Sequence, residues 1–259
     1  MLFSAGYGLR RALARAQSDA NDALEKLATG KRINRASDDP SGLVAAEKLR
    51  ADRTALDRTI RGLERESSFL GAKDGALSAL GELLIDLEGI VVSAANTGGL
   101  SEAERDALAA DADGILTAID HVATISIFNS QKLLAGYRTA DLGGDAGRLA
   151  DLRDALRSGE FESAQSIVEG ARDQVLGERG RIGGRLKGLD AERNAALETF
   201  ENVSGALSLI EDTDVAQEVS SLVRAQILEE ASVKTIQIER EQAAGALKLL
   251  EGAMAIARG

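Results

Sequence analysis

The sequence predicts an all-α fold: a long antiparallel helical bundle or coiled coil, with a short extended or hairpin segment and with terminal helices that form an inner two-helix unit. Alanine and leucine dominate the 44% of apolar residues, aromatic residues make up only 3%, and the 259 residues include one proline. This composition favours long helices. Two long apolar periodicities specify the bundle, and the first is a leucine ladder at Leu49, Leu56, Leu63, Leu70, Leu77 and Leu84, continued by Val91.

The second periodicity provides a partner for this ladder. Its positions alternate in steps of four and three, and only an arginine interrupts it: Ile182, Leu186, Leu189, Arg193, Ala196, Phe200, Val203, Leu207 and Ile210. A strict seven-residue repeat keeps one side of a helix turned toward the same neighbour over its whole length. Because the chain reverses between the two series, we expect the two long helices to pair antiparallel.

The first helix is amphipathic and ends at a break. Its apolar positions are Leu9, Leu13, Ala16, Ala20, Ala23 and Leu27. Gly30 is a natural C-terminal stop, and residues 29–42 interrupt the helical pattern. Asp39 precedes Pro40 and is therefore disfavoured in a helix. We expect Ser37, Asp38 or Asp39 to cap a second helix that begins near Ser41 and runs to about Asn96.

The middle of the chain is expected to contain shorter elements. Ser101 and the acidic residues after it predict a capped helix at about 102–124. The alternating Ile125 to Phe128 predicts a short extended piece. A glycine-rich stretch follows at 141–147, and further helices are expected at about 148–157 and from Phe161.

A phase slip at 211–214 predicts a boundary before the last helix. A new apolar face then includes Val215, Val219, Leu222, Val223, Ile227, Leu228, Leu247 and Leu250. If the long helices are antiparallel, this boundary and the 29–42 break lie at the same end of the bundle. The terminal helices, 2–29 and 215–253, then pair with each other. Each helix has a narrow apolar face that the other helix covers only in part. We therefore expect additional copies of the chain to cover these faces.

Three parts follow from these boundaries. Residues 1–35 with 215–259 form the terminal helices, residues 36–134 with 161–214 form the long bundle, and residues 135–160 form a short loop region.

Composition excludes several functions. The net charge of −11 argues against nucleic acid as the main partner, although the first 35 residues carry +4 and form a solvated basic face. There is no cysteine and only one histidine, His121, so no disulfide, thiolate site, histidine-based triad or multi-histidine metal site can form. No apolar run is long enough for a membrane span, and we expect no secretory signal at the N-terminus. We therefore predict no enzyme activity, no cofactor and no membrane insertion.

Two clusters have competing interpretations. Gly177, Gly180, Gly184 and Gly188 suggest a phosphate cradle, but the stretch lacks the required ending and follows no strand, so close approach of helices is favoured. Asp38 and Asp39, facing Glu211, Asp212 and Asp214, are candidate calcium ligands. Pairing of these carboxylates with nearby cations is favoured, and the cations are Lys31, Arg32 and Arg35.

Several segments, in matching order along nearly the whole chain, resemble bacterial flagellins. They are 27–43 (LATGKRINRASDDPSGL), 119–134 (IDHVATISIFNSQKLL), 179–183 (RGRIG), 201–204 (ENVS), 210–214 (IEDTD) and 226–228 (QIL). The resemblance implies a subunit of the flagellar filament, extracellular and used for motility, in a minimal form without large outer domains. It further implies homo-oligomerisation into a helical filament, export by the type III apparatus with an export chaperone, and contact with hook-associated and cap proteins.

The resemblance also assigns roles to residues. The apolar positions of the terminal helices form the polymerisation interface: Leu9, Leu13, Ala16, Ala20, Ala23, Leu27, Val219, Leu222, Val223, Ile227, Leu228, Leu247 and Leu250. The family motifs at the two breaks act as hinges: Gly30, Arg32, Ile33, Asn34, Asp38, Asp39, Asp212 and Asp214.

Two departures and two alternatives accompany the resemblance. The C-terminal segment lacks the family's usual glutamine-rich ending, and Glu88 stands where many flagellins have an arginine in a stretch read by a vertebrate innate immune receptor, so we expect weak recognition. A hook-filament junction protein of the same family is the main alternative function. A helical signalling hairpin is the alternative of another class, but it requires a membrane span.

Overall fold

A computed structural model describes residues 2–96, 99 and 101–257, with side chains described for 7–96, 99 and 101–249. The chain forms two compact units. One contains the residues up to 55 and those from 200 onward, and the other contains residues 56–199. Within the described residues, no helix carries an apolar stretch that could cross a membrane.

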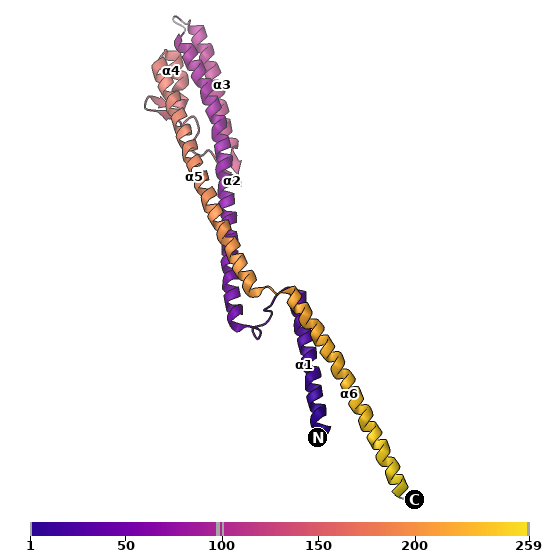
Figure 1. Cartoon of the computed structure of the whole chain (residues 1–259). Coiled ribbons are helices and arrows are strands. Elements are labelled where there is room, and N and C mark those ends of the chain that lie inside the picture. Colours follow the sequence, from indigo (N-terminus) through magenta and orange to yellow (C-terminus); the bar gives the residue numbers. More distant parts are fainter. Residues whose placement is uncertain (1, 97–98, 100, 258–259) are drawn as a thin grey trace. The chain divides into compact units, whose positions relative to one another are not determined.

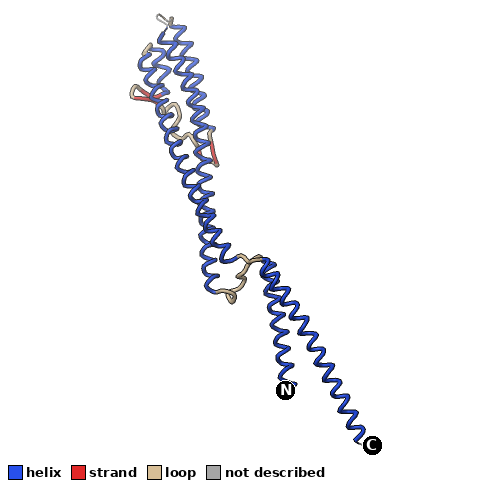
Figure 2. The backbone as a smooth tube through the Cα atoms, in the orientation of Figure 1, coloured by secondary structure: helices blue, strands red, loops and turns tan. Residues whose placement is uncertain are grey.

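The described chain is almost entirely helical, which confirms the predicted all-α class (Figure 2). The helices are α1 (Leu2–Thr29), α2 (Pro40–Asn96), α3 (Glu102–Ile125), α4 (Leu152–Ser158), α5 (Phe161–Glu211) and α6 (Val215–Ala257). A single 3₁₀ turn, η1 (Leu149–Asp151), precedes α4. These bounds agree closely with those expected from the periodicities and breaks.

The unit of residues 56–199 confirms the antiparallel pairing of the long helices. Successive ion pairs join higher numbers in α2 to lower numbers in α5: Glu66 to Arg185 at 2.8 Å, Asp74 to Arg179 at 2.9 Å and Glu88 to Arg172 at 2.5 Å. In Figure 1, α3 lies beside the second half of α2, and α4 lies beside α5.

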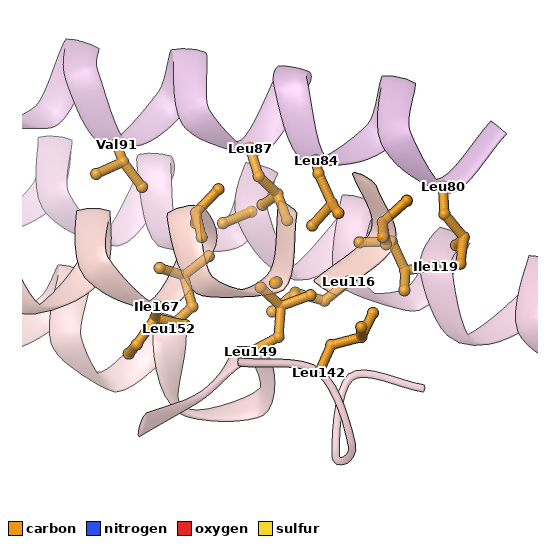
Figure 3. Close-up of a cluster of buried hydrophobic side chains, with 14 of the residues drawn as sticks. Leu80, Leu84, Leu87, Val91, Leu116, Ile119, Leu142, Leu149, Leu152 and Ile167 are labelled. Atoms are coloured by element: carbon orange, nitrogen blue, oxygen red, sulfur yellow. The ribbon is translucent and has the colours of Figure 1, made fainter. Parts of the chain in front are cut away.

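The leucine ladder is buried unequally along its length. Leu77, Leu84 and Val91 are fully buried, whereas Leu63 and Leu70 are only half-buried. The cause is the number of neighbours, because α3, α4 and the segment 133–156 pack around only the second half of α2. Figure 3 shows this core, with α2 side chains pointing toward those of α3, α5 and the 142–152 segment. Where α2 has fewer neighbouring helices, the leucine side chains of the ladder therefore stay partly exposed.

This unit also contains two small antiparallel hairpins. The first pairs β1 (Ile127–Phe128) with β2 (Gln131–Lys132), so the predicted extended piece is confirmed at 127–128, whereas Ile125 still belongs to α3. Asn129 and Ser130 have φ of 47° and 66°, as a two-residue turn between such strands requires. The second hairpin pairs β3 (Gly143–Gly144) with β4 (Gly147–Arg148) and was not predicted, because glycines carry no alternating pattern.

The expected close approach of helices at the glycine face of α5 is wrong. An added Cβ at Gly177, Gly180, Gly184 or Gly188 would meet no heavy atom within 4 Å among the described residues. In this stretch α5 instead buries Ile182 and Leu189, and Arg179 and Arg185 form ion pairs with α2. The glycines therefore face open space.

In the other unit, α1 and α6 pair antiparallel, and the C-terminal part of α6 extends past the start of α1 (Figure 1). Lys26 Nζ lies 3.1 Å from Glu218, and Gln17 donates a hydrogen bond to Glu229 at 3.0 Å. Ala16, Ala20 and Ala23 of α1 are buried. Small side chains at this spacing let the two helix backbones come close, so the predicted two-helix unit forms.

Candidate functional site

The two breaks between helices bind each other directly. The Arg32 backbone N–H donates to the Glu211 carbonyl at 2.6 Å, and the Thr213 N–H donates to the Gly30 carbonyl at 3.0 Å. The Arg32 guanidinium also donates to the Ile210 carbonyl at 2.6 Å. We call residues 30–39 and 210–214 together the joint. Its backbone hydrogen bonds confirm that both breaks lie at the same place.

A buried carboxylate lies at the centre of the joint. The Glu211 side chain is 6% exposed and forms ion pairs with Lys31, at 2.5 Å, and with Arg50. The Arg50 Nε also donates to Glu211 Oε2 at 3.0 Å. Burial alone raises the pKa of Glu211, but hydrogen bonds and charge from Arg50 and Lys31 outweigh it and hold that pKa below its usual value. The carboxylate is therefore ionised and links one break to the start of α2.

The other acidic residues of the joint act locally. Asp39 caps α2 by accepting hydrogen bonds from the Gly42 N–H at 2.8 Å and the Ser41 hydroxyl at 2.9 Å. Asp38 accepts from the backbone N–H groups of Asn34 and Arg35 at 3.0 and 2.8 Å. These backbone hydrogen bonds lower the pKa of both aspartates.

At the second break, Asp214 caps the N-terminus of α6, as Asp39 caps that of α2. It accepts hydrogen bonds from the N–H groups of Ala216 and Gln217 at 2.9 and 3.1 Å. Asp212 accepts from the Ser208 hydroxyl at 2.5 Å. The described residues contain no group of three or more His, Asp or Glu side chains placed to hold a metal ion. The carboxylates at the joint are thus engaged as caps and ion-pair partners.

The expected pairing of cations with these carboxylates holds only in part. Lys31 pairs with Glu211, but Arg35 pairs with Glu25 of α1. Asp38 instead accepts two backbone N–H groups, those of Asn34 and Arg35, through its Oδ2 atom. Arg32 uses its guanidinium on a backbone carbonyl instead of a carboxylate.

Two glycines and one buried isoleucine shape the joint. Gly30 ends α1 with φ of +70°, a conformation that favours glycine. Ile33 is 3% exposed. A Cβ at Gly42 would overlap the Asp39 carboxylate and lie 2.8 Å from Ile33 Cδ1. The first turn of α2 therefore needs glycine at this position to accept both its cap and Ile33.

The predicted interface residues of α1 face α6. Ala16, Ala20 and Ala23 are buried, and Leu9, Leu13 and Leu27 are half-buried. The α1 positions thus hold the pair of terminal helices together.

The predicted residues of α6 divide between two sides of the helix. Leu222 is half-buried, whereas Val219, Val223, Ile227, Leu228 and Leu247 are 43%, 47%, 62%, 51% and 61% exposed. The Leu250 side chain lies outside the described residues. The α6 residues that are buried include Ala225 and Ser232, which the apolar pattern missed. Their seven-residue spacing and small size, matching the alanine seam of α1, are the signal that could have found them.

Val219, Val223 and Ile227 form an exposed apolar row on α6. They recur every fourth residue and lie on the side opposite Ala225 and Ser232, as the 100° rotation per residue of an α-helix requires. Soluble monomers rarely leave such a row uncovered. The row, which we call the α6 row, is chemically suited to bind another apolar surface.

Comparison with known proteins agrees with this arrangement. Residues 5–139 match the model of the bacterial flagellin N-terminal helical region. The chain is 29% identical over 249 residues to a flagellin of Halalkalibacterium halodurans, covering 88% of this chain and 90% of that protein. It is 26% identical over 259 residues to the flagellar filament 30.7 kDa core protein of Treponema maltophilum, with the same coverage. A flagellin of Bacillus subtilis is 26% identical over 277 residues, covering 88% of this chain and 91% of that protein.

Proposed function

This chain belongs to the bacterial flagellin family, and from that membership we propose that it is a structural subunit which polymerises into the flagellar filament that serves motility. The observation that supports this function most directly is the exposed α6 row. A filament subunit needs a surface that is stable only when further copies cover it, and the row has that property.

Covering the row contributes one favourable part of the free energy of assembly. Burying a complete Val, Leu or Ile side chain contributes about 1.5–3 kcal/mol. Val219, Val223 and Ile227 are each roughly half exposed in the single chain. Covering the row therefore contributes on the order of 3 kcal/mol per subunit, before any contact by the rest of α6.

We assign the parts of the chain by function. The terminal helices, residues 1–35 with 215–259, polymerise as the inner tube. The long bundle, residues 36–134 with 161–214, forms the shell around it, and residues 135–160 face outward. The joint anchors the first part to the second, because its hydrogen bonds tie the chain before α2 to the chain after α5.

The same proposal includes a location and partners. The subunit is extracellular once exported through the flagellar type III apparatus with an export chaperone, and it contacts hook-associated and cap proteins at the ends of the filament. It is a structural protein without enzyme activity.

Self-polymerisation of the purified chain tests the function and separates it from that of a hook-filament junction protein. The informative variant is Val223→Asp with Ile227→Asp, which places charges in the α6 row. The control is Val223→Ile with Ile227→Val, which exchanges the two side chains and keeps the row apolar.

Electron microscopy after seeding should show long filaments for the parent chain and the control, and none for the Asp variant. A parent chain that does not polymerise by itself would favour the junction protein. Filaments of normal length from the Asp variant would refute the role of the row.

A further inference from the structure

Charge is distributed unequally within the unit of residues 56–199. Residues 76–175, where α3 and α4 lie beside α2 and α5, carry 17 Asp and Glu against seven Lys and Arg, which is a net charge of −10. We call this part the acidic half. The unit's two-helix half, residues 56–75 with 176–199, carries eight acidic against nine basic residues, a net charge of +1. The negative charge of the unit is therefore concentrated in the first of these halves.

Three of the nine basic residues of the two-helix half line one cavity, which Phe128 of the other half also lines. A cavity of about 590 Å³ is lined by Arg58, Arg61, Glu64, Arg65, Ser68 and Phe128. Arg61 pairs with Asp57 at 3.1 Å, and Glu64 pairs with Arg193 at 3.6 Å. Arg58 and Arg65 are exposed, and neither has an acidic partner among the described residues. The cavity thus presents guanidinium groups that this unit leaves uncompensated.

One aromatic side chain, that of Phe128, also lines this cavity. Phe128 of β1 packs edge-on against Phe69 of α2, with 6.0 Å between ring centroids. Next to it in the sequence, Ile127 is 55% exposed, and Ile125 at the end of α3 is 57% exposed. The cavity itself combines arginine side chains with one aromatic ring, and both residue types are enriched at protein interfaces.

The acidic half has a surplus that its own arginines do not neutralise. Arg138, Arg153, Arg157 and Arg172 are each already paired with a carboxylate of the same half. Exposed carboxylates without an ion pair among the described residues include Asp111, Asp141, Asp145 and Asp173. These groups are available to a partner.

We propose that the Arg58–Arg65 cavity binds the acidic half of the same unit in a second copy of the chain. The inference rests on the proposed filament function, because only a polymer presents copies in repeated register. Each copy would use its basic cavity on one neighbour and its acidic half on another. Such a head-to-tail contact uses different surfaces on the two partners and continues without closing, as a filament requires. The observation that selects a second copy is charge complementarity between two halves of one unit.

The test measures the critical concentration for seeded polymerisation at about 0.05 M and about 0.5 M salt, between which the range of charge interactions contracts severalfold. The variant Arg58→Glu with Arg65→Glu reverses the two uncompensated charges. The control Arg148→Glu with Lys187→Glu makes the same change in net charge at exposed basic residues outside the cavity. Circular dichroism checks that each variant keeps the helicity of the parent chain.

We expect the cavity variant to raise the critical concentration at low salt by about tenfold, the control by much less, and the difference to shrink at high salt. Adding Asp141→Lys and Asp145→Lys to the cavity variant should recover part of the loss, since opposite charges then meet again. Equal critical concentrations for the cavity variant and the control would overturn the proposal while leaving the filament function intact. Failure of the parent chain to polymerise would count against the filament function itself.

Discussion

Removing Arg50 tests whether the Glu211 ion pairs hold the joint together. The change Arg50→Gln deletes a charge that contacts the Glu211 carboxylate through both Nε and a terminal nitrogen. Glu211 stays buried, with Lys31 as its remaining partner. The expected result is local opening of the two breaks, without unfolding of the buried core around Leu84.

The free energy lost at the joint depends on how deeply Glu211 is buried and on how many cations still pair with it. Breaking a buried ion pair costs about 3–5 kcal/mol when the remaining charge is left alone. Here Lys31 still neutralises Glu211, and the Arg50 side chain is 29% exposed, so the loss is smaller. A charge-assisted hydrogen bond contributes about 1.5–3 kcal/mol. We therefore expect a loss of about 2 kcal/mol at the joint, which is roughly a 30-fold change in the opening equilibrium.

Hydrogen–deuterium exchange in assembled filaments measures this opening. The informative amides are those of Arg32 and Thr213, which donate to the opposite break. Their protection should fall by roughly 30-fold in Arg50→Gln, and protection around Leu84 should stay constant. Arg53→Gln is the matched control, because Arg53 lines the same polar cavity as Arg50 but is exposed. Unchanged protection of Arg32 and Thr213 would show that the ion pairs do not hold the joint.

Further predictions concern packing of the core, stability at acidic pH and activation of an immune receptor. Leu84→Ala, at a fully buried position, should lower the free energy of unfolding by about 3 kcal/mol in urea titrations, whereas Leu209→Ala, at a side chain 86% exposed, should change it by less than about 0.5 kcal/mol. The pKa of Glu178 is lowered by its hydrogen bond to Lys73, and that of Glu211 is lowered by Arg50 and Lys31 despite burial. Both therefore stabilise the fold above their ordinary pKa of 4.5, and thermal unfolding at stepwise lower pH should show stability falling as each titrates through its lowered pKa. A pH-independent midpoint below 4.5 would contradict this. Glu88 pairs with Arg172 at 2.5 Å, and we expect weak activation of the vertebrate innate immune receptor; a reporter-cell response equal to that of a standard flagellin would contradict that expectation.

Helix positions and pairing were predictable because each depends on local signals. The seven-residue ladder and its mate specify which faces of α2 and α5 meet, and Gly30, Pro40 and Ser101 mark where helices end or begin. Ser101 indeed forms a capping box with Glu104, accepting from its N–H at 3.3 Å. The unequal burial of the ladder was not predictable, because it depends on where α3 and α4 pack and not on the spacing of the leucines.

The candidate site was predictable at the level of segments and less so at the level of side chains. The pattern placed the two breaks together, but it could not assign the partner of each charge. Asp38 binds backbone N–H groups, whereas Arg35 forms its ion pair with Glu25 of α1. On α6 the apolar pattern identified the exposed row, whereas the side toward α1 is lined by small residues such as Ala225 that carry little hydrophobic signal.

The exposed face of α6 should be covered only when copies of the chain assemble. Hydrogen–deuterium exchange of peptides from residues 215–249, compared between the free chain and the filament, measures this coverage. We expect a large rise in protection in the filament, centred on Val219 to Ile227, with little change around Leu84, which is already buried in the single chain. Equal protection of the 215–249 peptides in the free chain and the filament would contradict it.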